Sequence, residues 1–460
     1  MKKLITLLLA GGMIFSCANN ASAVDVKVSG DWQASFTFVD NLFGRNALNK
    51  HRSQEDGSTG TFNAAQRVRV NFDLTAGEAL GGRVQLQATA GNDAANYYSW
   101  GQAGVGGPGE RVTARLAYLD WMIPNTDVQV RMGRQVVSTP SYTFSSPVLD
   151  EVSDGIMVSV PFSETAGITV GWLRPHAELN KWGVQHYAHN NVDLAYLAVD
   201  MTSDNLKLTP WGMIGLHGNG DGVREPGNMD MMGYGSSTDS RTTVYWAGIG
   251  AELGVFSPFK ITGDFIYSGN DADHAAERKG WYAALGAEVD TDTITPFVRG
   301  WYATGDDADS EESGRMLSVD NGGTFDASSI YFDGNSLLAA TIDNRSPAGT
   351  WGVQLGVKDF TFVEDLNHAL SVSYIKGTNN TNRITNGILR AQLGDLANPA
   401  TYMTTRDSAW EIDFLSSYKL YQNLSANLLL AYLITDFDKN VWGVDYENGF
   451  RGTLNFTYAF

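Results

Sequence analysis

Five arginines in the first third of the chain fall on one parity of segments in which polar and apolar residues alternate. A guanidinium group keeps its charge at any physiological pH, so it attracts anions and fixes local electric fields but transfers no protons. A wall of such groups therefore indicates recognition of charged or polar solutes rather than catalysis. These residues are Arg67, Arg69, Arg83, Arg115 and Arg131.

A short acidic stretch follows the arginines and supplies charges of the opposite sign. It contains Asp150, Glu151 and Asp154 within residues 136–155, VVSTPSYTFSSPVLDEVSDG. Carboxylates that face guanidinium groups across a narrow, low-dielectric passage produce a transverse field that orients polar solutes. We therefore predict that these acids oppose, or partly pair with, the arginines at the constriction of a water-filled passage. The alternative is an ordinary turn beside solvated arginines.

The segments that carry the arginines have the period of β-strands. In residues 24–38, VDVKVSGDWQASFTF, apolar and polar residues alternate strictly, and the pattern returns in 62–76 and 82–90. Successive side chains of a strand leave opposite faces, so each segment has one apolar and one polar face. Further segments bring the predicted number of strands to eighteen: 111–122, 127–135, 154–162, 167–174, 191–200, 206–217, 242–253, 258–268, 280–289, 293–303, 350–359, 368–377, 408–419, 424–435 and 449–460.

The connections between these segments alternate between short and long. Residues 77–80 and 290–292 are short polar turns, whereas 304–349 and 378–407 are long loops rich in Gly, Asp, Asn and Ser. This alternation is typical of the β-barrels that cross the bacterial outer membrane. We predict an all-β fold, one closed antiparallel barrel of 16 to 18 strands, with eighteen counted, over residues 24–460. A large secreted β-sandwich or β-helix is the alternative.

Residues 1–23 have the layout of a secretory signal peptide. Two lysines precede an apolar run over residues 4–15, and the triplet Ala21, Ser22 and Ala23 forms a small-residue cleavage site. The apolar run is too short for a membrane-spanning helix. Cys17, the only cysteine, leaves open cleavage before it and attachment of a lipid.

Composition and motifs disfavour several classes of function. The chain has 32 Lys and Arg residues against 51 Asp and Glu residues, a net charge of −19, which disfavours nucleic-acid binding. The histidines lack the spacing of metal ligands, so we predict no metal site and no cofactor. The nucleophile motif GxSxG is absent from the sequence, and we predict no catalytic residues and no enzymatic activity.

The C-terminal segment carries the most specific motif. GFRGTLNFTYAF, residues 449–460, alternates aromatic and polar residues and ends on Phe460, with Tyr458 on the same face. It resembles the last strand of the bacterial trimeric porins, whose C-terminal phenylalanine is a signal for the barrel-assembly machinery. VQVRMGRQ, residues 128–135, is similar to the end of the fifth porin strand, which precedes the loop that folds into the lumen.

The resemblance implies a general diffusion porin. Such a protein is a homotrimer in the outer membrane, in contact with lipid and lipopolysaccharide, through which small hydrophilic solutes and ions diffuse passively. It also implies that 136–155 is the constriction loop. The chain departs from the family because it lacks a PEFGG-like loop core and because eighteen strands are counted instead of sixteen. The second departure leaves open a substrate-specific channel for sugars or peptides, and the sign of the ion selectivity also stays open.

Overall fold

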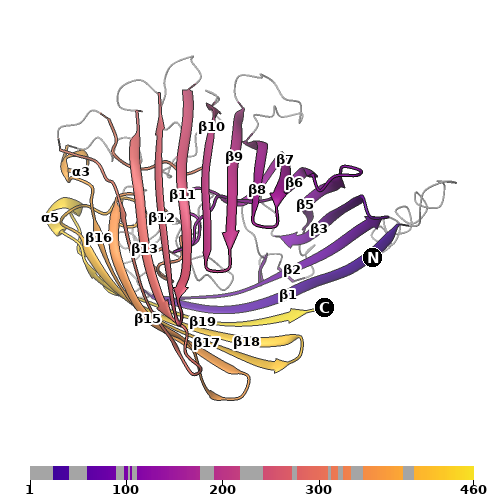
Figure 1. Cartoon of the computed structure of the whole chain (residues 1–460). Coiled ribbons are helices and arrows are strands. Elements are labelled where there is room, and N and C mark those ends of the chain that lie inside the picture. The colour runs from indigo at the N-terminus through magenta and orange to yellow at the C-terminus, as the bar shows by residue number, and fades with distance from the viewer. Residues whose placement is uncertain are drawn as a thin grey trace.

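The chain folds into a closed β-barrel, as its computed structural model shows (Figure 1). All strand pairs are antiparallel, and β1 pairs with both β2 and β19, so the sheet closes on itself. The structure describes residues 24–40, 60–89, 98–101, 104–105, 111–176, 191–217, 242–271, 277–308, 312–319, 325–332, 346–386 and 398–460. The predicted signal peptide, residues 1–23, lies outside the described residues.

Eighteen long strands build the wall, and each corresponds to one predicted segment, which confirms the predicted fold class. They are β1 (Asp25–Asp40), β2 (Gly60–Ala76), β3 (Leu80–Thr89), β5 (Arg111–Met122), β6 (Gln129–Ser138), β7 (Asp150–Ser163), β8 (Ala166–His176), β9 (Val192–Ser203), β10 (Leu206–His217), β11 (Thr242–Phe256), β12 (Phe259–Asn270), β13 (Lys279–Val289), β14 (Thr295–Ala303), β15 (Thr350–Val363), β16 (Leu366–Gly377), β17 (Ser408–Tyr421), β18 (Leu424–Asp436) and β19 (Gly449–Ala459).

Three short elements complete the described structure. A two-residue strand, β4 (Tyr98–Ser99), pairs with β2. The helices α3 (Asn382–Thr385) and α5 (Lys439–Trp442) have four residues each. No helix in the described part of the chain is long and apolar enough to cross a membrane.

The register of the strands separates an apolar outer face from a polar inner face. At the seam between β1 and β19, Trp32 lies opposite Tyr458, and the same outer parity carries Phe38 and Leu454. On the far side of the barrel Leu355 is 58% exposed and Phe265 is 46% exposed. Large apolar side chains that the chain itself leaves uncovered on one face are expected where a barrel meets lipid.

Long connections on one side of the barrel fold into its interior. Phe144 from the β6–β7 connection packs against Phe325, from the β14–β15 connection, at 4.7 Å between ring centroids. Both rings also contact Trp301 on the inner face of β14. The buried apolar cluster that they join includes residues of β6 and of most strands from β8 to β18, but no described residue of β1, β2, β3 or β5.

A buried carboxylate on the barrel wall holds one of these inward connections. Glu411 on β17 accepts hydrogen bonds from the backbone N–H groups of Ser329, Ile330 and Tyr331, at 2.7, 2.5 and 2.9 Å. Backbone donors inside a protein need partners because they have lost water. A wall carboxylate that accepts three of them therefore favours the inward path of the loop.

Candidate functional site

The five predicted arginines lie together on the inner face of four neighbouring barrel strands. Arg67 and Arg69 belong to β2, and the others to β3, β5 and β6. Their side chains are partly open to the lumen, with exposed fractions of 18% for Arg67, 19% for Arg115 and 36% for both Arg83 and Arg131. The strand assignment and the parity of this basic wall were predicted correctly from the alternation; its role in the constriction stays a prediction.

Two of the five arginines are neutralised by carboxylates on the adjacent strand. Arg83 donates to Asp73 from Nε at 2.6 Å and from Nη2 at 3.1 Å. Arg131 donates to Asp120 from Nε at 2.7 Å and from Nη2 at 2.9 Å. Such bidentate pairs fix the direction of both side chains. They add no net charge to the wall.

The other three guanidinium groups, those of Arg67, Arg69 and Arg115, outnumber their carboxylate partners. We call this set the arginine cluster. Arg115 Nη2 lies 3.4 Å from Glu151 Oε1, and Arg67 Nη2 lies 3.7 Å from Asp31 Oδ2. The Arg67 Nε atom is buried without a hydrogen-bond partner. The described residues therefore leave one hydrogen-bond donor of Arg67 unused.

Arg69 is the member of the cluster with no ion pair. Its Nε donates to the neutral Gln87 Oε1 at 2.7 Å. No carboxylate of the described residues lies within ion-pair distance of its guanidinium group. The cluster thus has three cations and two loosely paired anions, which leaves a local surplus of positive charge in the lumen.

The predicted acidic partners are placed differently from the expectation. β7 begins at Asp150, which pairs with Ser138 of β6, so the connecting loop is limited to residues 139–149. Glu151 has the inner parity and reaches the arginine cluster from the neighbouring wall. Asp154 has the outer parity of Ile156 and pairs with Arg134 at 3.1 Å.

Because Asp150 and Asp154 are on the outer parity of β7, the prediction that all three acids oppose or partly pair with the predicted arginines is wrong for these two. The physical reason is that the strand extends four residues beyond its predicted start at 154. Regular alternation then fixes the direction of each side chain. Only Glu151 of the predicted acidic set lines the lumen.

The loop at 139–149 does enter the barrel, and other residues hold it there. The two carboxylate oxygens of Asp264, on β12, accept hydrogen bonds from the backbone N–H groups of Tyr142 and Thr143, each at 2.8 Å. The Tyr142 hydroxyl lies 2.9 Å from the Thr209 hydroxyl on β10. Arg299 on β14 donates to the Thr143 carbonyl at 3.1 Å. The loop therefore extends from β6 and β7 to the wall formed by β10, β12 and β14.

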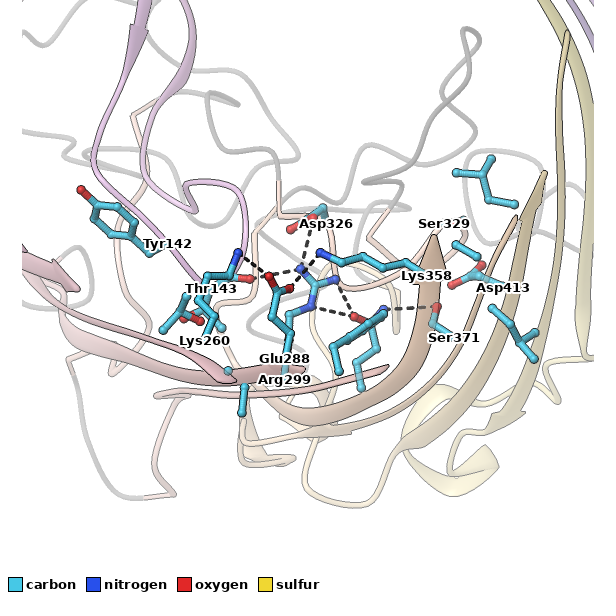
Figure 2. A pocket seen from close by; sticks show the side chains of 18 of the residues that line it. Tyr142, Thr143, Lys260, Glu288, Arg299, Asp326, Ser329, Lys358, Ser371 and Asp413 are labelled. Atoms are coloured by element: carbon cyan, nitrogen blue, oxygen red, sulfur yellow. Dashed lines mark hydrogen bonds and ion pairs between the residues drawn. The ribbon is translucent and has the colours of Figure 1, made fainter. Parts of the chain in front are cut away.

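The wall that faces the arginines contains a pocket. Strands nine positions apart lie opposite each other in a ring of eighteen, so β12 to β15 face β2, β3, β5 and β6. The pocket has a volume of about 370 Å³ and is bordered by the inward loop through Tyr142 and Thr143 (Figure 2). It is lined by the cations of Lys260, Arg299 and Lys358 and by the carboxylates of Glu288, Asp326 and Asp413.

The charges in this pocket are mostly paired with each other. Lys358 Nζ donates to Glu288 Oε2 at 2.8 Å, and Lys260 pairs with the other oxygen of Glu288. Arg299 donates from Nε to Gln354 Oε1 at 2.9 Å, and its Nη1 lies 3.5 Å from Asp326 Oδ2 (Figure 2). The facing wall is thus polar and nearly balanced, whereas the arginine cluster is not.

Sequence reasoning missed the residues of the facing wall. Asp264, Arg299 and Lys358 fall within predicted strands and have the inner parity, which is the same signal that selected the arginines. The contacts of Asp264 and Arg299 with the inward loop had no local signal, because Tyr142 and Asp264, for example, are 122 residues apart in the chain. Polar residues of inner parity in every strand would have been the better candidate set.

A closed eighteen-stranded barrel with an apolar exterior and a charged interior is the architecture of the β-barrel proteins that cross the bacterial outer membrane. The chain is accordingly an outer-membrane β-barrel. No protein-family model and no curated protein matches its sequence.

Several solved structures share the fold, among them three channels from Pseudomonas aeruginosa. OccK2 (OpdF) superimposes with a TM-score of 0.56 at 10% identity, over 95% of this chain and 97% of that one. OccD3 (OpdP) gives 0.52 at 13% identity, over 96% and 92%, and OprD gives 0.53 at 12%, over 94% and 95%. At these identities the likeness concerns the fold alone. It supports the eighteen-stranded outer-membrane barrel fold and gives no support to the general diffusion, trimeric type that the sequence resemblance implied.

Proposed function

We propose that this protein is a selective outer-membrane channel for small hydrophilic solutes and that it prefers solutes with a carboxylate or another anionic group. The observation that carries the proposal is the arginine cluster. Its three guanidinium groups face the lumen with two carboxylates at 3.4 and 3.7 Å, and Arg69 has no carboxylate partner among the described residues. Fixed charge on a low-dielectric wall concentrates solutes of the opposite sign and lowers the barrier to their entry.

The packing inside the barrel favours selectivity over free diffusion. The loop at 139–149 and the segment 325–332 occupy the interior beside the facing wall, where they bury Phe144, Phe325 and Phe332. Solutes then pass along the polar inner face of β1, β2, β3 and β5, next to the arginine cluster. A channel, rather than an enzyme, is the function that this arrangement of fixed charges supports.

A sugar acid is a suitable first probe of the proposal. The P. aeruginosa OccK2 structure in complex with glucuronate has a TM-score of 0.55 to this chain at 10% identity, over 95% of this chain and 98% of that one. Glucuronate combines one carboxylate with several hydroxyl groups. We propose that its carboxylate interacts with Arg67 and Arg69 during passage, in the way that guanidinium groups bind carboxylates with paired hydrogen bonds.

Passive diffusion of ions and small solutes without a preferred substrate is the second candidate. The charge-balanced pairs of Arg83 with Asp73 and of Arg131 with Asp120 favour it, because they form a part of the wall with no net charge. From the porin-like last strand we also propose a homotrimer, and from residues 1–23 export by a signal peptide. Phe460 and Tyr458 are the proposed signal for the barrel-assembly machinery.

Uptake into proteoliposomes tests the proposed function. We expect glucuronate to enter faster than glucose through the wild-type protein. In the Arg67→Gln/Arg69→Gln variant, glucuronate uptake should fall about tenfold while glucose uptake is unchanged. Two opposite unit charges about 4 Å apart attract each other by about 1 kcal/mol in bulk water and by about 4 kcal/mol near a protein surface, and about 1.4 kcal/mol corresponds to a factor of about ten.

The matched control is Asp73→Asn/Arg83→Gln, which removes a bidentate pair from the same wall without changing its net charge. This control should keep the wild-type preference for glucuronate. Equal losses for glucose and glucuronate in the arginine variant, or no loss for either, would contradict the proposal.

A further inference from the structure

The strands β6 to β9 are neighbours in the barrel wall (Figure 1), and each contributes one charged residue of outer parity, so that four charges form a row on the outer face. The row is made of Arg134, Asp154, Arg174 and Asp193, with one residue from each strand and with alternating sign. Arg134 lies opposite Asp154, and Asp154 lies opposite Arg174, in the strand register. We call this set the outer charged row.

Charge in such a position is unusual for this barrel. Arg134 and Asp154 are each four residues away from the ends of β6 and β7 at which the long loops begin. In the other described strands, charged residues of outer parity lie within two residues of a strand end or, for Asp359, at a β-bulge. The row is therefore a local feature of this sector and not a general property of the outer face.

The height of the row can be estimated from the apolar positions beneath it. On β7 the outer positions below Asp154 are apolar down to Phe162, and on β9 those below Asp193 are apolar down to Met201. Eight residues of a strand tilted by about 45° rise roughly 20 Å, against an apolar band of about 25 Å. The row consequently lies at the upper edge of this band, level with the headgroups of the outer leaflet. At that level an exposed arginine destabilises a barrel far less than at the midplane of the membrane.

The row leaves hydrogen-bond donors unused on its outer side. Arg134 donates to Asp154 only through Nη1, at 3.1 Å, and the described residues supply no other partner to it. Its side chain is 45% exposed. Arg174 uses Nε and Nη2 for Asp193, at 2.8 and 2.9 Å, and its third nitrogen has no partner among the described residues.

The geometry of Arg174 is fixed before any partner arrives. Trp172 donates from Nε1 to the same Asp193 oxygen at 3.0 Å, and the Arg174 guanidinium carbon lies 5.0 Å from the Trp172 ring centroid. A guanidinium group held between a carboxylate and an aromatic ring has lost most of its rotational freedom, so little further entropy is lost on binding. Two partly exposed guanidinium groups on one face are suited to a phosphate group.

We propose that the outer charged row binds the phosphorylated headgroup of an outer-leaflet lipid, with the chemistry of lipid A. Arg134 and Arg174 donate to the phosphate oxygens, and Asp154 and Asp193 hold the two arginines in place. The level of the row in the membrane and the sign of its unused groups favour this occupant over a second copy of the chain. The inference depends on the barrel lying in the outer membrane but not on the proposed solute preference, so either can fail alone.

Native mass spectrometry of the detergent-purified protein with added bisphosphorylated lipid A tests the proposal. We expect wild-type protein to retain the lipid and Arg134→Gln/Arg174→Gln to bind it at least about tenfold more weakly, because charge-assisted hydrogen bonds are lost. The matched control is Lys376→Gln, which removes an outer-parity cation from β16, far from the row. Its binding should equal that of the wild type.

Two further arms decide the role of the phosphate and of the carboxylates. Dephosphorylated lipid A should bind weakly to every variant. Asp154→Asn/Asp193→Asn keeps both arginines and one acceptor oxygen for each, and it removes two negative charges beside the phosphate, so it should bind bisphosphorylated lipid A at least as well as the wild type. If the double arginine variant does not fold, as judged by its heat-dependent shift in electrophoretic mobility, Arg134→Gln alone replaces it, because Arg134 makes a single ion pair.

Equal binding of the wild type and the arginine variants would overturn the proposal, as would equal binding of lipid A with and without phosphate. A wild-type oligomer that dissociates in the arginine variants while lipid binding persists would also overturn it, since a second copy would then occupy the row.

Discussion

One carboxylate holds the tip of the 139–149 loop through two backbone N–H groups, and replacing it gives a strong test of the lumen structure. Asp264 accepts the backbone N–H groups of Tyr142 and Thr143, each at 2.8 Å. The substitution Asp264→Ala removes both acceptors. Hydrogen bonds to charged groups contribute about 1.5 to 3 kcal/mol each, so the loop tip loses roughly 3 to 6 kcal/mol of docking free energy.

Part of this loss is offset, because the alanine variant no longer carries the cost of burying a carboxylate. With a net loss of about 3 kcal/mol, the undocked population of the loop tip rises more than 100-fold. The rest of the loop stays attached, since Ser145 N still donates to Asp326 Oδ1 at 2.8 Å and Phe144 still packs against Phe325. The tip is therefore loosened and the loop is not expelled.

Single-channel recording in planar bilayers measures this change. We expect Asp264→Ala to show larger open-channel current fluctuations and a higher mean conductance than the wild type. Asp264→Asn keeps one acceptor and should be intermediate. Asp120→Asn is the control, because it also removes a lumenal carboxylate but one that pairs with Arg131 rather than with the loop. If Asp264→Ala has the same conductance and noise as the wild type, the account of the loop anchor is refuted.

Three further predictions concern the loops and the seam. Tyr402→Phe removes a hydroxyl that donates to the buried Asp306 at 2.7 Å, so the free energy of unfolding should fall by about 1 to 3 kcal/mol; an unchanged midpoint of thermal denaturation would contradict this. A hydrogen bond from the Asn440 N–H lowers the pKa of Asp438. The cap on α5 should therefore be intact above the ordinary carboxyl pKa and be lost as pH falls through the lowered value, seen as faster exchange of the Asn440 amide after correction for intrinsic rates. Deleting Phe460 removes the last hydrogen bonds between β1 and the C-terminus and should reduce the yield of heat-modifiable barrel, whereas a normal yield would exclude its role in assembly.

The strands were predictable because membrane and lumen impose a local rule. Every second residue meets lipid and every other one meets the interior, so a period of two in the sequence identifies each strand without knowledge of its partners. β5 and β10 have the predicted bounds, 111–122 and 206–217. β4 was missed because two residues are too few to show a period.

The positions of the lumenal charges were predictable only in part. The parity of Arg67 and Arg69 follows from the alternation, but the direction of Asp154 depends on where β7 begins, and strand boundaries are the least certain part of a sequence-based prediction. Inward folding of 139–149 is stabilised by contacts with distant strands, such as that of Asp264 with Tyr142, which has no local signal in the sequence. Contacts between loops and a distant wall require the closed barrel before they can be identified.

The central claim is that a water-filled passage with a surplus of positive charge crosses this barrel. Its most direct test is the reversal potential of the purified wild-type protein in planar bilayers under a KCl gradient. We predict stepwise conductance and a reversal potential of the sign that indicates chloride preference, with this preference lost in Arg67→Gln/Arg69→Gln. Absence of conductance, or a reversal potential of the sign that indicates potassium preference, would contradict the claim.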